Sequence, residues 1–186
     1  MFAALSINRL KKASPEKLEF GCGPSITPGY SGVDIRLFKG VQFVCRAWDI
    51  SKYVKKGSVV EIYSRHFLEH LTYPQAELTI KAWSCILRPE GTLIIIVPDI
   101  DYHISQFNSE DEMLASDANP AWTVRQHAIA GFWGWQRQGE TKLWDVHKSG
   151  YNYSLLSSWL NRYGYVKIER VVDKPWNLHV KAVKSL

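Results

Sequence analysis

Short apolar runs separated by turn residues dominate the first half of the chain. They predict four short strands, at Lys17–Phe20, Ser31–Ile35, Val41–Cys45 and Ser58–Ser64. The apolar run Thr92–Val97 predicts a fifth strand, of the kind that is buried on both faces. A helix is predicted to begin near Pro74, because apolar residues then recur at helical spacing, at Leu78, Ala82, Cys85 and Ile86. Strands that alternate with helices predict an α/β fold with a mainly parallel sheet.

The pattern changes in the second half of the chain. Asp99–Gly150 is polar, aromatic and irregular, which predicts helices and loops over the C-terminal edge of the sheet, where a substrate would bind. Asn152 is the predicted N-cap of a last helix, which Gly164 closes. Tyr165–Val172 and Leu178–Val183 alternate as strands and predict a terminal antiparallel hairpin.

Length and composition indicate one globular domain. The 186 residues are 46% hydrophobic, enough for a sizeable core, and no repeat or linker-like stretch divides them. We predict a single domain over residues 1–186. Within it, a short amphipathic lead-in over 1–16 precedes a core at 17–99, a lid at 100–150, and the last helix with its hairpin at 151–186.

Charge and cysteine usage narrow the setting. The net charge of +5 would suit an anionic partner, but no block of five like charges occurs, so a solvated basic surface is favoured. Cys22, Cys45 and Cys85 are far apart and form no C-x-x-C pair, which is typical of reduced cysteines in the cytosol. Leu93–Val97, the longest apolar run, is too short to span a membrane, and Met1–Lys12 lacks signal-peptide features. The chain is therefore predicted to be cytoplasmic.

The stretch KLEFGCGPS, from Lys17 to Ser25, organises the first half of the chain. Gly21 and Gly23 allow a tight turn and a close approach of backbone to a ligand, which a Cβ would block. A strand that ends in such a turn is where open α/β sheets bind nucleotide-like ligands. The following Pro24–Gly32 contains two prolines and two glycines, so a long helix is not expected there.

Four stretches, taken together, carry a family resemblance: KLEFGCGPSITPGYSGVDI, WDI, EIYSRHFLEHL and AWSCILRPEGTLIIIVPD. In order and spacing they resemble the class I S-adenosylmethionine-dependent methyltransferases, most closely the bacterial and phage-type branch. The resemblance covers residues 17–99, and residues 145–165 also look like the C-terminal portion of that branch. It implies a Rossmann-like methyltransferase fold, with a mainly parallel seven-stranded sheet, a C-terminal antiparallel hairpin and S-adenosylmethionine (SAM) as cofactor.

The resemblance also implies which residues bind the cofactor. The implied set is Glu19, Gly21, Cys22, Gly23, Asp34, Ile35, Asp49 and Ile50, with Ser64, Arg65 and His66 as the far wall of the pocket. Gly21 and Gly23 would lie against the methionine part. Asp34 would accept hydrogen bonds from both ribose hydroxyls, since a carboxylate suits a vicinal diol. Asp49 and Ile50 would lie at the adenine edge.

Simpler interpretations of these residues stay open. Asp34 could cap the turn before Arg36, and Asp49 could cap the turn before Ser51. Only about ten residues separate Gly23 from Asp34, where other members of the family fit a whole helix whose N-terminus helps to place the cofactor. The alternative to an enzyme is therefore a catalytically degenerate binding or scaffold protein with the methyltransferase fold.

The stretch His66-Phe-Leu-Glu69-His70 matches the H-x-x-E-H pattern of one class of zinc peptidases. It follows a strand exit, however, and its last residues coincide with the EHL of the methyltransferase resemblance. We therefore predict no metal site, and expect Glu69 and His70 to hydrogen-bond backbone and hold the turn.

The predicted reaction is methylation of a hydroxyl on a small or glycan-like acceptor. No Asn/Asp-Pro-Pro-aromatic or Pro-Cys motif follows the fourth strand, so nucleic acid is not an expected substrate. A hydroxyl acceptor needs a base near neutral pH, and His147 is the candidate, with His103, His127 and Asp99 in the same region. The lid tryptophans would stack on a sugar ring or form the core of the lid; they are Trp122, Trp133, Trp135 and Trp144.

Overall fold

Seven strands form one sheet in the computed structural model, which describes residues 12–109, 114–136 and 144–186. They are β1 (Lys17–Phe20), β2 (Ser31–Asp34), β3 (Val41–Val44), β4 (Val59–Arg65), β5 (Leu87–Pro98), β6 (Tyr165–Val171) and β7 (Asn177–Lys184). Their order is β3-β2-β1-β4-β5-β7-β6; the first five are parallel, and β7 runs antiparallel to both neighbours. The predicted fold class, a mainly parallel seven-stranded sheet with a C-terminal antiparallel hairpin, is confirmed.

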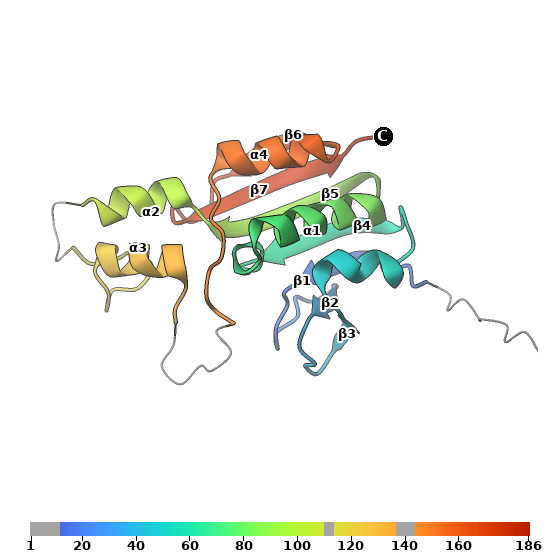
Figure 1. Ribbon diagram of the computed structural model, residues 1–186, viewed down its shortest axis with the longest axis horizontal. Helices are drawn as coiled ribbons and strands as arrows, with labels where there is room; N and C mark the ends of the chain where they lie inside the picture. The colour runs from blue at the N-terminus through green and yellow to red at the C-terminus, as the bar shows by residue number, and fades with distance from the viewer. Residues whose placement is uncertain (1–11, 110–113, 137–143) are drawn as a thin grey trace, which may run out of the picture.

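The helices fall into two groups (Figure 1). The 3-10 helix η1 (Ala47–Lys52) and the helices α1 (Tyr73–Ile86) and α4 (Tyr153–Arg162) lie over one face of the sheet. Helices α2 (Ile100–Phe107) and α3 (Val124–Trp133) pack on each other beyond the carboxyl ends of β4 and β5 and form the cap. The described part of Asp99–Gly150 thus contains helices at this edge, as predicted; residues 110–113 and 137–143 lie outside the described residues.

The core lies between the sheet and its helices. Phe20 of β1 contacts Trp83 of α1, with ring centroids 5.0 Å apart, and both side chains are buried. Ile62 and Ile95 add fully buried side chains from the central strands. Burial of each such side chain contributes about 2 kcal/mol, so this apolar layer holds the carboxyl ends of the strands in fixed positions.

On the opposite face a loop takes the place of a helix. Residues 21–30, which connect β1 to β2, contain no helix. The hydroxyl of Tyr30 donates a hydrogen bond to Glu61 of β4, and its ring lies 5.8 Å from that of Tyr63. The backbone N–H and hydroxyl of Thr27 donate to Glu19 of β1. The expectation that no long helix follows the glycine turn is confirmed, and polar side chains of the sheet hold the loop.

Local signals in the sequence mark the helix ends correctly. The side chain of Asn152 accepts a hydrogen bond from the backbone N–H of Leu155 at 3.0 Å and begins α4, and Gly164, with φ of 76°, follows the end of that helix. The helix predicted to begin near Pro74 is α1, which begins at Tyr73. Of the apolar residues that indicated it, Leu78 is 52% exposed, and the buried stripe includes Ala76, Ile80 and Trp83.

The ends and the surface of the molecule add two observations. Of the lead-in predicted for residues 1–16, residues 1–11 lie outside the described residues, while Ala13 pairs with Val54 next to η1.

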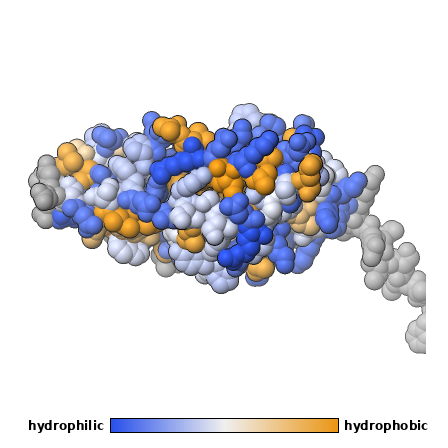
Figure 2. All heavy atoms as spheres, turned by 90° about the horizontal axis from the view of Figure 1, so that it is seen from above, coloured by the Kyte–Doolittle hydropathy of each residue, from blue (hydrophilic) through white to orange (hydrophobic). Residues whose placement is uncertain are grey.

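Seen from above, apolar residues are scattered among polar ones (Figure 2). Among the described residues, none of the helices has the length and apolar character needed to cross a membrane.

Candidate active site

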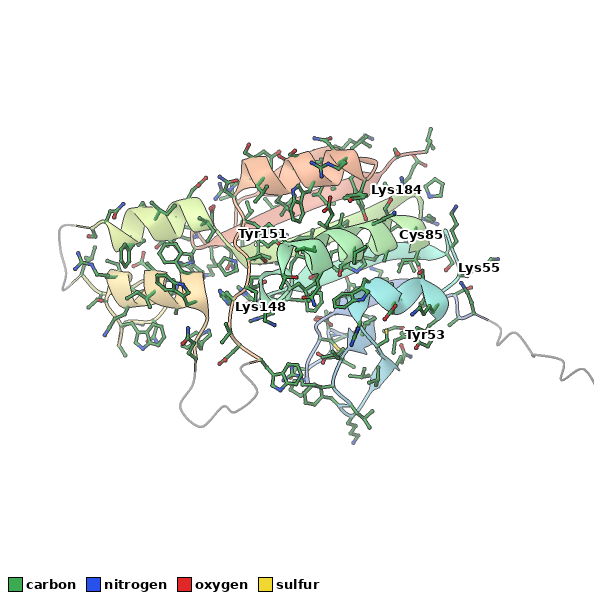
Figure 3. The ribbon with its side chains drawn as sticks, viewed as in Figure 1. Tyr53, Lys55, Cys85, Lys148, Tyr151 and Lys184 are labelled. Atoms are coloured by element: carbon green, nitrogen blue, oxygen red, sulfur yellow. The ribbon has the colours of Figure 1, made fainter. Side chains whose placement is uncertain are left out.

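A cavity of about 490 Å³ opens at the carboxyl ends of β1, β2 and β4. The glycine turn and the end of β2 form one wall, and residues 45–48 form another. The third side comes from the segment that runs from the cap to α4, which contributes Trp144, Asp145 and Lys148. Figure 3 shows Lys148 and Tyr151 on this segment, where it crosses the ends of the strands. The cavity thus lies at the carboxyl edge of the sheet, where open α/β sheets bind their ligands.

Asp34, the last residue of β2, is 6% exposed and lines the cavity. Its Oδ2 accepts a hydrogen bond from the backbone N–H of Gly23 at 3.0 Å. Its Oδ1 accepts from the backbone N–H of Arg36 at 2.8 Å and from the Arg36 guanidinium at 3.4 Å. Asp34 therefore caps its own turn and ties down the glycine turn, and the same carboxylate faces the cavity.

The wall beyond β3 differs from the expected adenine edge. Arg46, Ala47 and Trp48 line the cavity, whereas Asp49 and Ile50 do not. The Asp49 carboxylate pairs with the Lys52 ammonium at 2.6 Å, and Ile50 is fully buried in the core. The cause is η1, which begins at Ala47 and directs the following residues toward Lys52 and the core.

Glu19, Cys22 and Ser64 also lie away from the cavity lining. Glu19 is bound to the loop on the opposite face of the sheet, and Ser64 is fully buried on β4. Burial, with Asp34 and Glu19 nearby, raises the pKa of the Cys22 thiol to about 11. Cys22 is therefore a neutral thiol at pH 7, which is typical of a packing residue and not of a nucleophile.

The far wall was predicted at Ser64, Arg65 and His66, and of these His66 alone lines the cavity. Arg65 is exposed at the end of β4. Four members of the predicted cofactor set therefore line the cavity: Gly21, Asp34, Ile35 and His66. Of the four lid tryptophans that the sequence singles out, Trp144 lines the cavity. Sequence reasoning missed Trp48 and Lys148, which also line it.

Behind the cavity wall, His147 meets the turn that follows β4. That turn contains the 3-10 helix η2 (Leu68–His70). The His147 ring lies 5.0 Å from the ring of His70, which lines the cavity, and the cluster includes the carboxylate of Glu69. The His147 Nδ1 is 2.8 Å from the carbonyl oxygen of Gly131 in α3. Burial lowers the pKa of His147, so its imidazole is neutral at pH 7.

The other two lid histidines form a second pair, inside the cap. The rings of His103 and His127 are 5.1 Å apart, and the His127 Nδ1 lies 3.0 Å from the hydroxyl of the buried Ser116. Asp99, the remaining candidate base, begins α2 and pairs with Arg170 of β6. These three residues do not line the cavity.

Comparisons with known proteins agree on the fold. No family model and no curated protein matches the chain. A SAM-dependent methyltransferase from Archaeoglobus fulgidus superposes with a TM-score of 0.59 at 13% identity, over 93% of this chain and 87% of that chain. The 1,6-didemethyltoxoflavin-N1-methyltransferase of Burkholderia thailandensis, solved with 1,6-didemethyltoxoflavin and S-adenosylhomocysteine, superposes with a TM-score of 0.53 at 15% identity, over 91% and 71%. The fold is that of the SAM-dependent methyltransferases.

A further structure marks the limits of this likeness. A possible exported protein from Bordetella parapertussis gives a TM-score of 0.58 at 14% identity, over 94% of this chain. The present chain spans 63% of that protein's chain. At such low sequence identities, these comparisons show that the chain has the methyltransferase fold.

The residues around the cavity fit the cofactor that the methyltransferase fold implies. The Asp34 carboxylate has acceptor capacity left for a ribose hydroxyl, since its Oδ2 keeps one acceptor position and the 3.4 Å contact with Arg36 is long enough to exchange. Gly21, with φ of 67°, brings backbone to the cavity wall without a side chain. Trp48 and Phe67 supply apolar walls. The Gly23 amide, in contrast, is already used by Asp34.

Proposed function

We propose that this chain is a SAM-dependent methyltransferase. The observation that carries the proposal is the position of the Asp34 carboxylate. It lies at the end of β2 on the wall of a cavity of about 490 Å³, at the carboxyl edge of a methyltransferase-like sheet. A cytoplasmic setting and a single domain with the predicted subdivision stay predictions.

When bound, SAM supplies an electrophilic methyl group on a sulfonium. In this proposal Asp34 accepts hydrogen bonds from the ribose hydroxyls, and the backbone of Gly21 lies against the methionine part, while the missing Cβ of Gly21 makes room for Phe67. Trp144 and Lys148, from the segment between the cap and α4, form one side of the cavity. Positioning of two reactants in this way supplies much of the rate of a transfer reaction.

The acceptor in this proposal is a hydroxyl of a small or glycan-like molecule. Transfer would break the S–CH3 bond of the sulfonium, with S-adenosylhomocysteine as the leaving group, and form an O–CH3 bond. The hydroxyl proton is released and needs an acceptor close to the cavity. The Glu69–His70–His147 cluster supports this step, because His70 lines the cavity and His147 contacts His70. The Nδ1 of His147 is held by the Gly131 carbonyl, so Nε2 is the atom that would take the proton.

Calorimetric titration of the protein with SAM and with S-adenosylhomocysteine tests the proposal. Micromolar binding, on the order of −8 kcal/mol, is expected. Asp34→Asn should weaken it by about tenfold or more, since a charged acceptor contributes about 1.5–3 kcal/mol per hydrogen bond. Asp49→Asn is the matched control and should change affinity by less than about threefold, because that carboxylate pairs with Lys52 outside the cavity. Absence of binding by a folded sample would overturn the proposal.

A binding or scaffold role is the second candidate, and the loop after the glycine turn favours it. Residues 21–30 form no helix, and the Gly23 N–H donates to Asp34. The site therefore lacks the helix N-terminus that would attract the cofactor's carboxylate. Cofactor binding with no transfer to any hydroxyl acceptor in a broad screen would favour this second role over catalysis.

A further inference from the structure

Three potential metal-ligating groups converge beside the cavity. Glu69 and His70 come from η2, and His147 comes from the segment between the cap and α4. One ligand atom from each lies within 4.8 Å of the other two. A tetrahedral ion with bonds of about 2.1 Å holds its donor atoms roughly 3.4 Å apart. Small side-chain rotations therefore bring the three groups to bonding distance of one ion.

Both imidazoles are oriented for coordination. The Nδ1 of His70 lies 3.1 Å from the Val146 carbonyl oxygen, and the Nδ1 of His147 lies 2.8 Å from the Gly131 carbonyl oxygen. A carbonyl oxygen only accepts hydrogen bonds, so each Nδ1 carries a proton and each Nε2 keeps its lone pair. Metal-binding histidines have this arrangement, in which a backbone carbonyl fixes the ring and its tautomer.

The carboxylate of Glu69 is buried and accepts no hydrogen bond from the described residues. The residue is 1% exposed, and neither carboxylate oxygen has a hydrogen bond among the described residues. Its ionic neighbour is the Nδ1 of His66 at 3.3 Å, which carries charge only when that imidazole is protonated. A buried carboxylate in this state is costly. A bound cation would satisfy it, and a ring nitrogen of each imidazole lies within 4.8 Å of a Glu69 carboxylate oxygen.

We propose that Glu69, His70 and His147 bind one divalent transition-metal ion, with zinc as the best match. Two neutral imidazoles and one carboxylate are the protein ligands of catalytic zinc sites, which keep an open coordination position. The 2-His-1-carboxylate set also binds ferrous iron. The third donor comes from far along the chain, so the H-x-x-E-H pattern alone, which pairs His66 with His70, does not describe this site.

The role of the ion rests on the proposed function. His70 lines the cavity, so the open position would accept the oxygen of a hydroxyl acceptor there. A metal ion lowers the pKa of a bound hydroxyl in the way that it lowers that of water, and the proton then leaves to solvent. In the metal-loaded protein His147 binds the ion and does not accept the proton itself. The ion then does the work of the general base that the sequence predicts.

Zinc and cobalt titrations of the metal-stripped protein test the site. One equivalent of Zn²⁺ should remain after gel filtration, and Co²⁺ should give visible absorption bands. Glu69→Gln and His147→Gln should each weaken binding by on the order of 100-fold or more, since loss of an outer-shell partner alone costs about 10–100-fold. Glu69→Gln should keep the fold, because the carboxylate makes no hydrogen bond that the amide would lose.

His179→Gln is the matched control. His179 lies 3.9 Å from Asp173 with no third donor near them in the described set, so this variant should bind Zn²⁺ like the parent. Failure of the parent to retain Zn²⁺, or equal Zn²⁺ binding by all three variants, would overturn the metal site. SAM binding, measured separately, decides the proposed function, so the two proposals fail independently. If the protein binds Zn²⁺ at this site but keeps its methyl-transfer activity after a chelator removes the ion, the catalytic role of the ion is rejected.

Discussion

Two pairs of histidines with nearly the same ring spacing occupy very different settings in this protein. The rings of His70 and His147 are 5.0 Å apart, and those of His103 and His127 are 5.1 Å apart. The first pair is half-buried beside the cavity and next to a buried carboxylate. The second lies inside the cap, with no carboxylate in reach among the described metal-ligating groups. Ring spacing alone does not make a site; the carboxylate and the fixed Nδ1 atoms distinguish the two.

Gly131 of α3 joins the two pairs. Its carbonyl oxygen accepts from His147, while a Cβ added at this position would come within 2.5 Å of the His103 ring. The cap therefore positions one imidazole of the cavity cluster and packs against an imidazole of its own pair. Four substitutions separate the roles of the two pairs.

The largest expected effect is the acid sensitivity of the cap. Burial, with His127 and His147 nearby, lowers the pKa of His103 to about 4 from its ordinary 6.5. Folding then favours the neutral imidazole, so stability is full above pH 6.5 and falls as the pH drops toward 4. The loss is roughly 3 kcal/mol over that interval. His103→Phe keeps a ring and removes the titration, so its free energy of unfolding should fall less with acid in denaturant titrations at pH 7 and pH 4.5. Identical pH dependence of the two proteins would contradict this assignment.

Zn²⁺ affinity should depend on the pair beside the cavity and not on the pair inside the cap. His70→Gln removes a proposed ligand and should weaken Zn²⁺ binding by about 100-fold. His127→Gln alters the pair inside the cap, where the His127 Nδ1 lies next to the Ser116 hydroxyl. It should change Zn²⁺ binding by less than about threefold. Competition with a chromophoric chelator measures both constants. Equal losses for the two variants would mean that the pairs do not differ in the proposed way.

Gly131→Ala tests the link between the pairs. The added methyl group meets the His103 ring, and overpacking of this kind costs about 1–3 kcal/mol. The displaced carbonyl should also weaken Zn²⁺ binding by about tenfold, because the support of His147 is lost. Thermal unfolding and chelator competition on the same sample follow both effects. A loss of stability with no change in Zn²⁺ affinity would show that the link does not operate.

The smallest effect is expected outside both pairs. Asn152→Ala removes the N-cap of α4 and should cost about 1 kcal/mol in the free energy of unfolding. It should leave Zn²⁺ affinity and acid sensitivity unchanged, since the cap hydrogen bond involves neither histidine pair. Denaturant unfolding at pH 7 with a zinc titration checks this; a change in Zn²⁺ affinity would indicate wider coupling through the segment before α4.

Local sequence signals were sufficient for most of the fold. Apolar runs fixed the strands to within a residue or two, except that β5 begins five residues before the predicted Thr92. Glycine and proline content showed that no helix follows Gly23, and Asn152 and Gly164 marked the ends of α4. These features depend on neighbouring residues and on backbone conformation, so they are readable without tertiary structure.

The site was predicted only in part, because tertiary packing decides which side chains share a wall. The family resemblance implied Asp34 and His66, each at the end of a predicted strand, and both line the cavity. It also implied Asp49 and Ile50, which do not line it, since η1 rotates them toward Lys52 and the core.

The cluster behind the cavity shows the same division most clearly. The sequence by itself determined that Glu69 and His70 follow a buried strand. The tertiary structure alone brought His147 to them, because the segment from the cap crosses the ends of the strands and its backbone N–H groups donate to the Glu69 carbonyl. Contacts between residues so far apart in the chain depend on how the elements pack, and local periodicity holds no record of that packing.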